Sequence, residues 1–254
     1  MYPLNVALAM FGSMLFGSLA GKLAQRWLPD HHFSNPTKRA VRLTAGLIVT
    51  LSALVISLMV SSAKTSFDAK RSELNEISAN LVLLDRTLAL YGPETQPIRD
   101  RLRREVAARI AKLWPEEAGR IPEEFRNTDP VNLEGVEAEV VALVPRNDAQ
   151  RQFKSDALQV NWSLAHARWI LDVQTHEPSV PKAFLFVLAF WLMFVFAAFS
   201  FQSTWNSTVA AAYAFSALAV SCSVYLILEL DSAYYGLIRL SSSPMFEALS
   251  RLGK

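Results

Sequence analysis

The sequence lacks several features that define soluble enzymes and secreted domains. Cys222 is the only cysteine among 254 residues, which excludes an internal disulfide framework and a cysteine-based zinc cluster. The net charge is only +2, so the chain has no basic excess for a nucleic-acid backbone. Charged residues make up 19% of the chain and hydrophobic residues 52%. An ordinary soluble domain is less apolar, so the composition indicates a membrane protein.

Charged side chains are absent from four long runs of the sequence. A helix of about 20 apolar residues spans the hydrocarbon layer of a bilayer and satisfies its own backbone there. The runs cover residues 1–21, 43–63, 183–201 and 209–228 and predict four transmembrane helices. The first run could instead be a signal peptide cleaved near Ala20, but no Lys or Arg precedes Lys22 to form a basic leader.

The charge of the chain is concentrated between the second and third runs. Of the 48 charged side chains, 36 lie from Lys64 to Lys182. Apolar residues in this region recur at alternating spacings of three and four, which is typical of amphipathic helices. The pattern extends the second span to Tyr91, predicts a helix from Pro97 to Trp114, and predicts a third helix after Pro145 with Asn147 or Asp148 as its N-cap. Prolines 115, 122 and 130 predict an irregular stretch between the last two helices.

The predicted fold is therefore all-α, with four transmembrane helices and a cytoplasmic helical bundle between the second and third. Its expected parts are membrane helices at 1–63, a charged helical region at 64–182, membrane helices at 183–230 and a tail at 231–254. The loop between the first two spans has five Lys and Arg, whereas the opposite side has eight near the membrane. The positive-inside rule then places both termini and the charged region in the cytoplasm.

Motifs for catalysis or metal binding are weak or missing. Residues 17–22 resemble a phosphate-binding loop, but the motif is one residue short and Leu23 replaces the Ser or Thr that magnesium requires. The adjacent His31 and His32 would need a further fixed ligand to hold a metal ion. The four spans have no ionisable groups except Cys222 and three tyrosines. The sequence thus indicates neither an enzyme nor a metal or cofactor site.

Small residues form stripes in three of the spans. In the first span Ser13, Gly17 and Gly21 recur at four-residue spacing. The fourth span has a similar stripe, with one shorter step, that consists of Ala210, Ala214, Ala217 and Ser221. Such stripes favour close helix packing. The second span has a small, hydroxyl-bearing face that consists of Gly46, Thr50, Ala53, Ser57 and Ser61. In a monomer this face would pack against another helix. In a ring of subunits it could line a narrow aqueous pore, where hydroxyl groups replace part of an ion's hydration.

Two groups of charged residues allow a functional and a structural interpretation. Glu229 and Asp231 follow the fourth span, where carboxylates could form a cation-attracting ring in an oligomer or a solvated helix end. The helix near residues 99–112 is strongly basic and could contact anionic lipid. A solvated face, balanced by the acidic segment at 116–139, is the favoured interpretation because eight acidic residues follow it directly.

Several short motifs, in order, resemble a family of bacterial membrane proteins of unknown function that have a bestrophin-like domain. They are Leu84-Asp85-Arg86, Tyr91-Gly92-Pro93-Glu94, Pro145-Arg146-Asn147-Asp148, Arg168-Trp169 and the closing stretch 241–249. The chain departs from the family pattern at Ser200, where a glycine is usual, and at Asp231-Ser232-Ala233, where Asp-x-Pro is usual. The resemblance implies a multi-pass protein of the bacterial inner membrane that assembles in the lipid bilayer as a homo-oligomer, a pentamer by analogy, with the second span around the axis.

Two functional hypotheses follow. The leading one is a homo-oligomeric ion channel whose pore is lined by Gly46, Thr50, Ser57 and Ser61, with Glu229 and Asp231 attracting ions. The alternative is a non-conducting scaffold or sensor that binds a partner through its cytoplasmic helical bundle. The motif residues Asp85, Arg86, Tyr91, Gly92 and Pro93 are expected to have a structural role, with the two charged residues forming salt bridges between helices. A regulatory site at Asp85 and Arg86 is the less favoured alternative.

Overall fold

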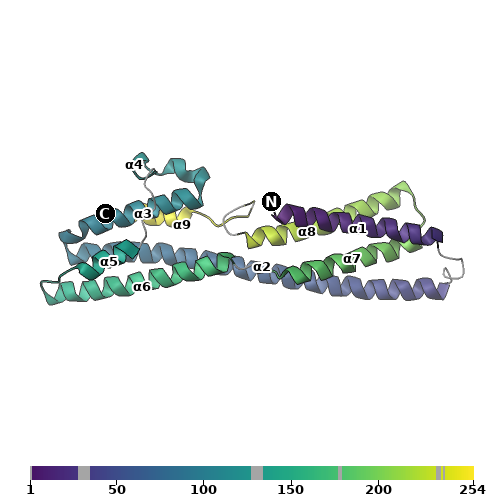
Figure 1. Ribbon diagram of the computed structural model, residues 1–254, viewed down its shortest axis with the longest axis horizontal. Coiled ribbons are helices and arrows are strands. Elements are labelled where there is room, and N and C mark those ends of the chain that lie inside the picture. The colour runs from purple at the N-terminus through teal and green to yellow at the C-terminus, as the bar shows by residue number, and fades with distance from the viewer. Residues whose placement is uncertain (1, 28–34, 127–133, 177–178, 233–235, 237) are drawn as a thin grey trace. The chain divides into compact units, whose positions relative to one another are not determined.

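The computed structural model describes residues 2–27, 35–126, 134–176, 179–232, 236 and 238–254, and every regular element within these ranges is a helix (Figure 1). The helices are α1 (Tyr2–Trp27), α2 (Asn35–Tyr91), α3 (Gln96–Leu113), α4 (Glu123–Arg126), α5 (Glu134–Ala142), α6 (Asp148–His176), α7 (Lys182–Gln202), α8 (Ser207–Asp231) and α9 (Ser243–Arg251), with two 3₁₀ turns, η2 (Pro93–Thr95) and η3 (Pro115–Arg120). The predicted all-α class is confirmed.

Four of the helices are long and apolar enough to cross a bilayer. They are α1, α2, α7 and α8, and each contains one of the four uncharged runs. The helix α2 has 57 residues, because the apolar pattern of the second run passes into an amphipathic pattern with no glycine or proline between Gly46 and Gly92. The prediction that this helix continues beyond the membrane is confirmed by its length.

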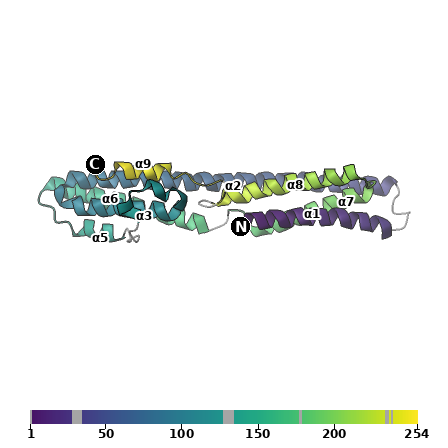
Figure 2. The same cartoon turned by 90° about the horizontal axis from the view of Figure 1, so that it is seen from above.

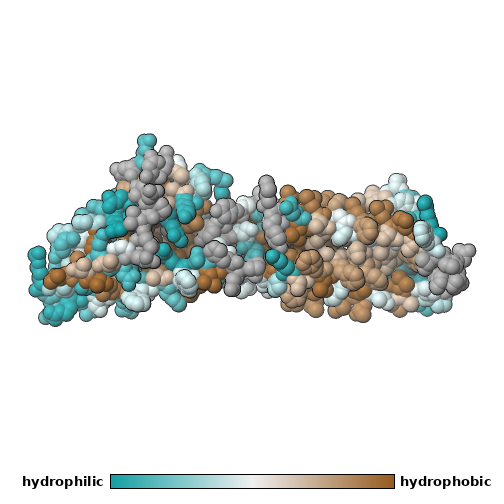
Figure 3. Space-filling model, viewed as in Figure 1, coloured by the Kyte–Doolittle hydropathy of each residue, from teal (hydrophilic) through white to brown (hydrophobic). Residues whose placement is uncertain are grey.

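Internal contacts divide the chain into two units. Residues 1–67 and 178–232 form the first, which we call the membrane unit, and residues 68–177 and 233–254 form the second, which we call the polar unit. Hydrophobic side chains gather over the membrane unit and hydrophilic ones over the polar unit (Figure 3). The helix α2 begins in the membrane unit and ends in the polar unit.

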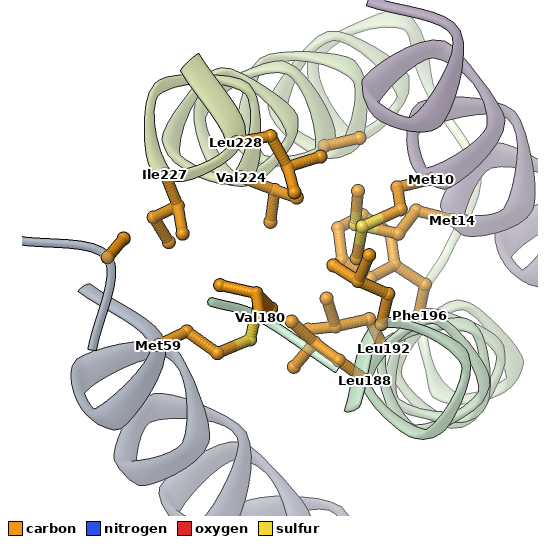
Figure 4. Close-up of a cluster of buried hydrophobic side chains, with 13 residues drawn as sticks. Met10, Met14, Met59, Val180, Leu188, Leu192, Phe196, Val224, Ile227 and Leu228 are labelled. Atoms are coloured by element: carbon orange, nitrogen blue, oxygen red, sulfur yellow. The ribbon is translucent and has the colours of Figure 1, made fainter. Parts of the chain in front are cut away.

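The membrane unit is built around α1, which packs against α7 and α8. Its apolar core includes Met14, Leu188 and Val224, one from each of these helices, and Met59 of α2 (Figure 4). The small-residue stripe of α1 explains the close packing. A Cβ atom added to Gly17 or Gly21 would lie only 2.3 or 2.1 Å from a backbone oxygen of α7. The predicted packing role of this stripe is therefore confirmed.

The polar unit has a core formed by the buried faces of α2, α3 and α6. Its buried residues include Leu74, Ile77, Leu81, Leu84 and Leu88 of α2, Ile98, Leu102, Val106 and Ile110 of α3, and Ala157, Leu164, Ala167 and Leu171 of α6. They belong to the apolar pattern that recurs at three- and four-residue spacings along these helices. Lys70 interrupts the apolar pattern of α2 and is nevertheless buried, with 1% of its surface exposed.

Helix ends in the polar unit follow the predicted start and stop signals. The helix α3 runs from Gln96 to Leu113, within one residue of the predicted bounds. Asn147 is the cap of α6, because its side chain accepts a hydrogen bond of 2.8 Å from the amide of Gln150. The proline-rich stretch forms η3 and α4, and α5 follows after residues that lie outside the described ranges.

Candidate functional site

The hydroxyl-bearing face of α2 is exposed in the subunit. Gly46, Thr50, Ser57 and Ser61 all belong to the exposed residues of the helix. The residues that α2 buries within the membrane unit are different ones: Ala45, Ser52, Met59 and Ala63. At about 100° per residue, the centres of these two faces are about 135° apart. The small polar face is thus not the face that packs inside the subunit.

A stripe of leucines lies beside this hydroxyl-bearing face. Leu43, Leu47, Leu54 and Leu58 are between 59% and 70% exposed, and they follow one another at helical spacings. The helix α2 therefore presents one small polar face and one apolar face outside the subunit. Lipid or another subunit covers an apolar face in a bilayer, whereas a polar face is more stable against water or another polar group.

Basic residues mark both ends of the hydroxyl-bearing face. Arg39 and Arg42 precede it and Lys64 follows it, and all three side chains are exposed on the same side of α2. No Asp or Glu occurs in α2 before Asp68. The charges nearest to this face along its own helix are therefore positive.

The two carboxylates after the fourth span lie near other elements of the membrane unit. Asp231 accepts hydrogen bonds from the amide of Ser179, at 3.1 Å, and from the hydroxyl group of the same residue. Glu229 is 5% exposed and accepts a hydrogen bond of 2.8 Å from the hydroxyl group of Tyr225. Ser62 of α2 donates to the Ser179 carbonyl at 3.1 Å. Ser179 thereby connects α2, α8 and the segment before α7.

An apolar pocket of about 160 Å³ lies beside these contacts. Its lining comes from α2 and the start of α7 and consists of Val55, Leu58, Met59, Ser62, Ser179, Val180, Pro181 and Phe184. Met59 and Val180 point toward one another at this place (Figure 4). By the same helical geometry the pocket is on the side of α2 that is opposite to the hydroxyl-bearing face.

The structural motif of the polar unit contains a buried ion pair between α2 and α3. Arg99 donates from Nε and Nη2 to the two carboxylate oxygens of Asp85, at 2.8 and 2.9 Å. Asp85 is fully buried, and Arg99 is 8% exposed. The hydrogen bonds from Arg99 to Asp85 raise the pKa of the guanidinium group, although burial opposes them. This bidentate geometry is the strongest form of Arg–carboxylate contact.

The end of the chain that the structure describes joins the same ion pair. The amide of Gly253 donates to Asp85 at 3.2 Å, and the Lys254 carbonyl accepts from Arg99 at 3.0 Å and from Arg86 at 3.4 Å. The helix α9 before it packs against α3. At the other end of the tail, the indole nitrogen of Trp114 donates to the Leu240 carbonyl at 3.0 Å. No pattern in the sequence predicts these tail contacts.

The Tyr91-Gly92-Pro93 motif forms the turn between α2 and α3. Gly92 has a φ of 143°, in the region that favours glycine, and a Cβ there would lie 2.6 Å from a carboxylate oxygen of Glu94. Pro93 begins η2, and the buried hydroxyl group of Thr95 donates to the Leu88 carbonyl at 2.6 Å. The side-chain amide of Gln150 donates from Nε2 to the Tyr91 carbonyl at 3.0 Å. The motif thus connects the ends of three helices.

The basic helix α3 uses its charges in different ways. Arg101 forms an ion pair with Glu139, in the acidic segment that was expected to balance this helix. Arg104 and Arg109 are exposed. Glu105 is buried, and burial raises its pKa, while the charges of Arg101 and other neighbouring arginines oppose this shift.

No group of three or more His, Cys, Asp or Glu residues with metal-binding geometry occurs within the part of the chain that the structure describes. The candidate pair His31 and His32 lies outside those residues. Cys222 is exposed on α8.

Comparison with known proteins places this arrangement in a family. The bestrophin-like domain matches residues 11–245 of the sequence. A mutant of the bacterial bestrophin homologue from Klebsiella pneumoniae has a similar fold, with a TM-score of 0.61 at 15% identity over 95% of this chain and 97% of that one. A second structure of that homologue gives 0.58 at 14% identity over 94% and 95%. A structure described as a membrane protein gives 0.58 at 14% identity over 97% and 99%. No curated protein sequence matches significantly.

The four long apolar helices and the helical polar unit define a multi-pass membrane protein of all-α fold. The chain belongs to the bestrophin-like family, since the family match extends over more than nine-tenths of its length. The resemblance stated from the sequence motifs is therefore confirmed.

Proposed function

We propose that this protein is a homo-oligomeric ion channel of the bacterial inner membrane, with α2 around the central axis. The observation that carries the proposal is the exposure of Gly46, Thr50, Ser57 and Ser61 on a face that α2 does not use for packing within the subunit. Copies of this face around an axis would line a pore with small side chains and hydroxyl groups. Membership of the bestrophin-like family supports this arrangement.

The surroundings of α2 agree with such a ring. The exposed leucine stripe beside the hydroxyl-bearing face offers an apolar contact for the next subunit. Arg39 and Arg42 at one end of the face and Lys64 at the other would form basic rings at the two mouths, and these attract anions. A pentamer is the subunit number that the bestrophin analogy favours. The excess of Lys and Arg near the polar region supports cytoplasmic termini.

The substitution Ser57→Trp tests the pore lining. We expect it to lower ion flux more than about tenfold, because an indole ring fills a pore lined by small side chains. The measurement is flux from proteoliposomes together with currents in planar bilayers. Leu218→Trp is the matched control, since Leu218 is 52% exposed in another transmembrane helix, α8, and belongs neither to α2 nor to the pocket. Its flux should stay near that of the unmodified protein.

The outcomes separate the candidate functions. Equal flux in Ser57→Trp and in the unmodified protein would contradict the proposal that the hydroxyl-bearing face lines the pore. An assembled protein that conducts no ion under any tested gradient would instead favour the scaffold or sensor, with the polar unit as the place where a partner binds.

The ion-attracting role of Glu229 and Asp231 is a separate part of the proposal. Glu229→Gln removes the charge and keeps an acceptor oxygen for Tyr225. In asymmetric sodium chloride we expect this substitution to move the reversal potential toward that of chloride, and Arg42→Gln to move it toward that of sodium. If Glu229→Gln leaves the reversal potential unchanged, this carboxylate has only a packing role in α8.

A further inference from the structure

Two tryptophans are exposed on α6 of the polar unit. Trp162 and Trp169 each expose 69% of their surface, and Val173 exposes 39%. Together with the exposed His166, they recur at spacings of four, three and four and therefore lie on one face of the helix. Aromatic side chains that are this exposed in a charged unit are typical of an interaction surface. We call these four residues the tryptophan stripe.

The polar-unit part of α2 has an exposed face with the same spacing. Its residues are Ser72, Glu76, Ala79, Leu83, Arg86 and Leu90, and the two leucines are 51% and 65% exposed. Three of these six side chains, Ser72, Glu76 and Ala79, are small or acidic, and they occupy the part of the face nearer to the membrane unit in sequence. We call these six residues the α2 stripe.

The heights of the two stripes along the bundle can be compared. The helices α2 and α6 run side by side in opposite directions (Figures 1 and 2), and the hydrogen bond between Gln150 and Tyr91 sets their register. Both rise by about 1.5 Å per residue, so Leu164 lies level with Ile77 and Ala157 with Leu84. All four of these residues belong to the buried faces of the two helices.

The same register places large residues of one stripe level with small residues of the other. Trp162 is level with Ala79, and Trp169 with Ser72. His166 is level with Asn75 and is next to the height of Glu76. The two stripes thus match in size, with indole rings opposite small side chains, and in hydrogen bonding, with the imidazole N–H donor of His166 near the height of the Glu76 carboxylate.

We propose that the tryptophan stripe of one copy packs on the α2 stripe of the next copy, with Trp162 against Ala79 and Trp169 against Ser72. This inference rests on the proposed assembly as a ring. Rotation about an axis parallel to α2 keeps every residue at its height, so residues that are level within one copy are also level between neighbouring copies. Both stripes are exposed in the single subunit, so each is accessible to a second copy of the chain.

Disulfide trapping between two differently tagged chains tests the contact. In a Cys222→Ser background, one chain has Trp162→Cys and the other Ala79→Cys, and both are produced together in membranes. After mild oxidation we expect a disulfide-linked heterodimer that both tags retain. The matched control replaces Trp162→Cys by Ser163→Cys, because Ser163 is also exposed but points about 100° away. We expect the control to lose the heterodimer.

A second measurement keeps the test decisive if the cysteine variants assemble poorly. Native mass spectrometry of Trp162→Glu with Trp169→Glu should show loss of the ring and folded monomers of unchanged helix content. Rings of the unmodified protein that show no heterodimer and resist the double glutamate substitution would overturn this contact and leave the channel proposal intact. Absence of rings in the unmodified protein would overturn the ring assembly itself, and the tryptophan stripe would then belong to a different partner.

Discussion

Gly21→Leu is expected to destabilise the membrane unit strongly. A Cβ at this position would lie 2.1 Å from the Ala197 carbonyl oxygen and within 3.0 Å of two further backbone atoms of α7. Backbone atoms inside a packed helix pair cannot rotate away as a side chain can, so α1 must move off α7. Overpacking costs about 1–3 kcal/mol and occasionally more, and we expect the upper part of this range. The measurement is the melting temperature in nanodiscs.

Gly12→Leu is the control for this effect. Gly12 lies in the same helix, and a Cβ there would meet no atom within 4 Å. Its melting temperature should stay close to that of the unmodified protein. If both substitutions lowered the melting temperature equally, the loss would come from leucine in α1 in general, and the close approach to α7 would not be its cause.

Arg99→Met is expected to destabilise the polar unit by about 3–5 kcal/mol, because it leaves the fully buried carboxylate of Asp85 without its cation. The double substitution Asp85→Leu with Arg99→Met should recover most of this loss, since it removes both charges. The free energy of unfolding can be measured by denaturant titration followed by helix content. The single substitution should also increase proteolysis of the tail, because Arg99 binds the Lys254 carbonyl.

The exposed ion pair between Arg151 and Asp148 serves as the comparison. Both of its side chains are more than 70% exposed, and such pairs contribute within about 1 kcal/mol. Arg151→Met should therefore change the unfolding free energy little. If Arg99→Met lowered the free energy of unfolding no more than Arg151→Met, water would reach Asp85. The ion pair between Asp85 and Arg99 would then not hold α3 on α2.

Features that depend on local sequence could be predicted closely. The ends of α3 follow from Pro97 and from Trp114-Pro115, since proline is favoured in the first helical turn and stops a helix that precedes it. The cap of α6 follows from Asn147, whose side chain reaches the backbone three residues later. The continuity of α2 follows from a periodic pattern without glycine or proline between Gly46 and Tyr91.

Contacts between distant segments could not be predicted in this way. The sequence marked Asp85 as part of a motif, but its bond to Gly253 joins residues that are 168 positions apart. The contact of Ser179 could not be predicted either, because no sequence pattern distinguishes this residue. Ser179 donates to Asp231 from both its amide and its hydroxyl group. Helix α9 was likewise not predicted, because its nine residues are too few to show a reliable period.

The amino-acid sequence by itself determined the class of the protein, the four spans and the apolar face of each long helix, because length, charge and period act locally along the chain. The tertiary structure decided which of these faces pack inside the subunit. For α2 it buries Ala45 and Met59 and leaves the hydroxyl-bearing face exposed. The physical reason is that a period fixes the angle of a side chain around its own helix, whereas the neighbour at that angle depends on how all the helices fill the core together.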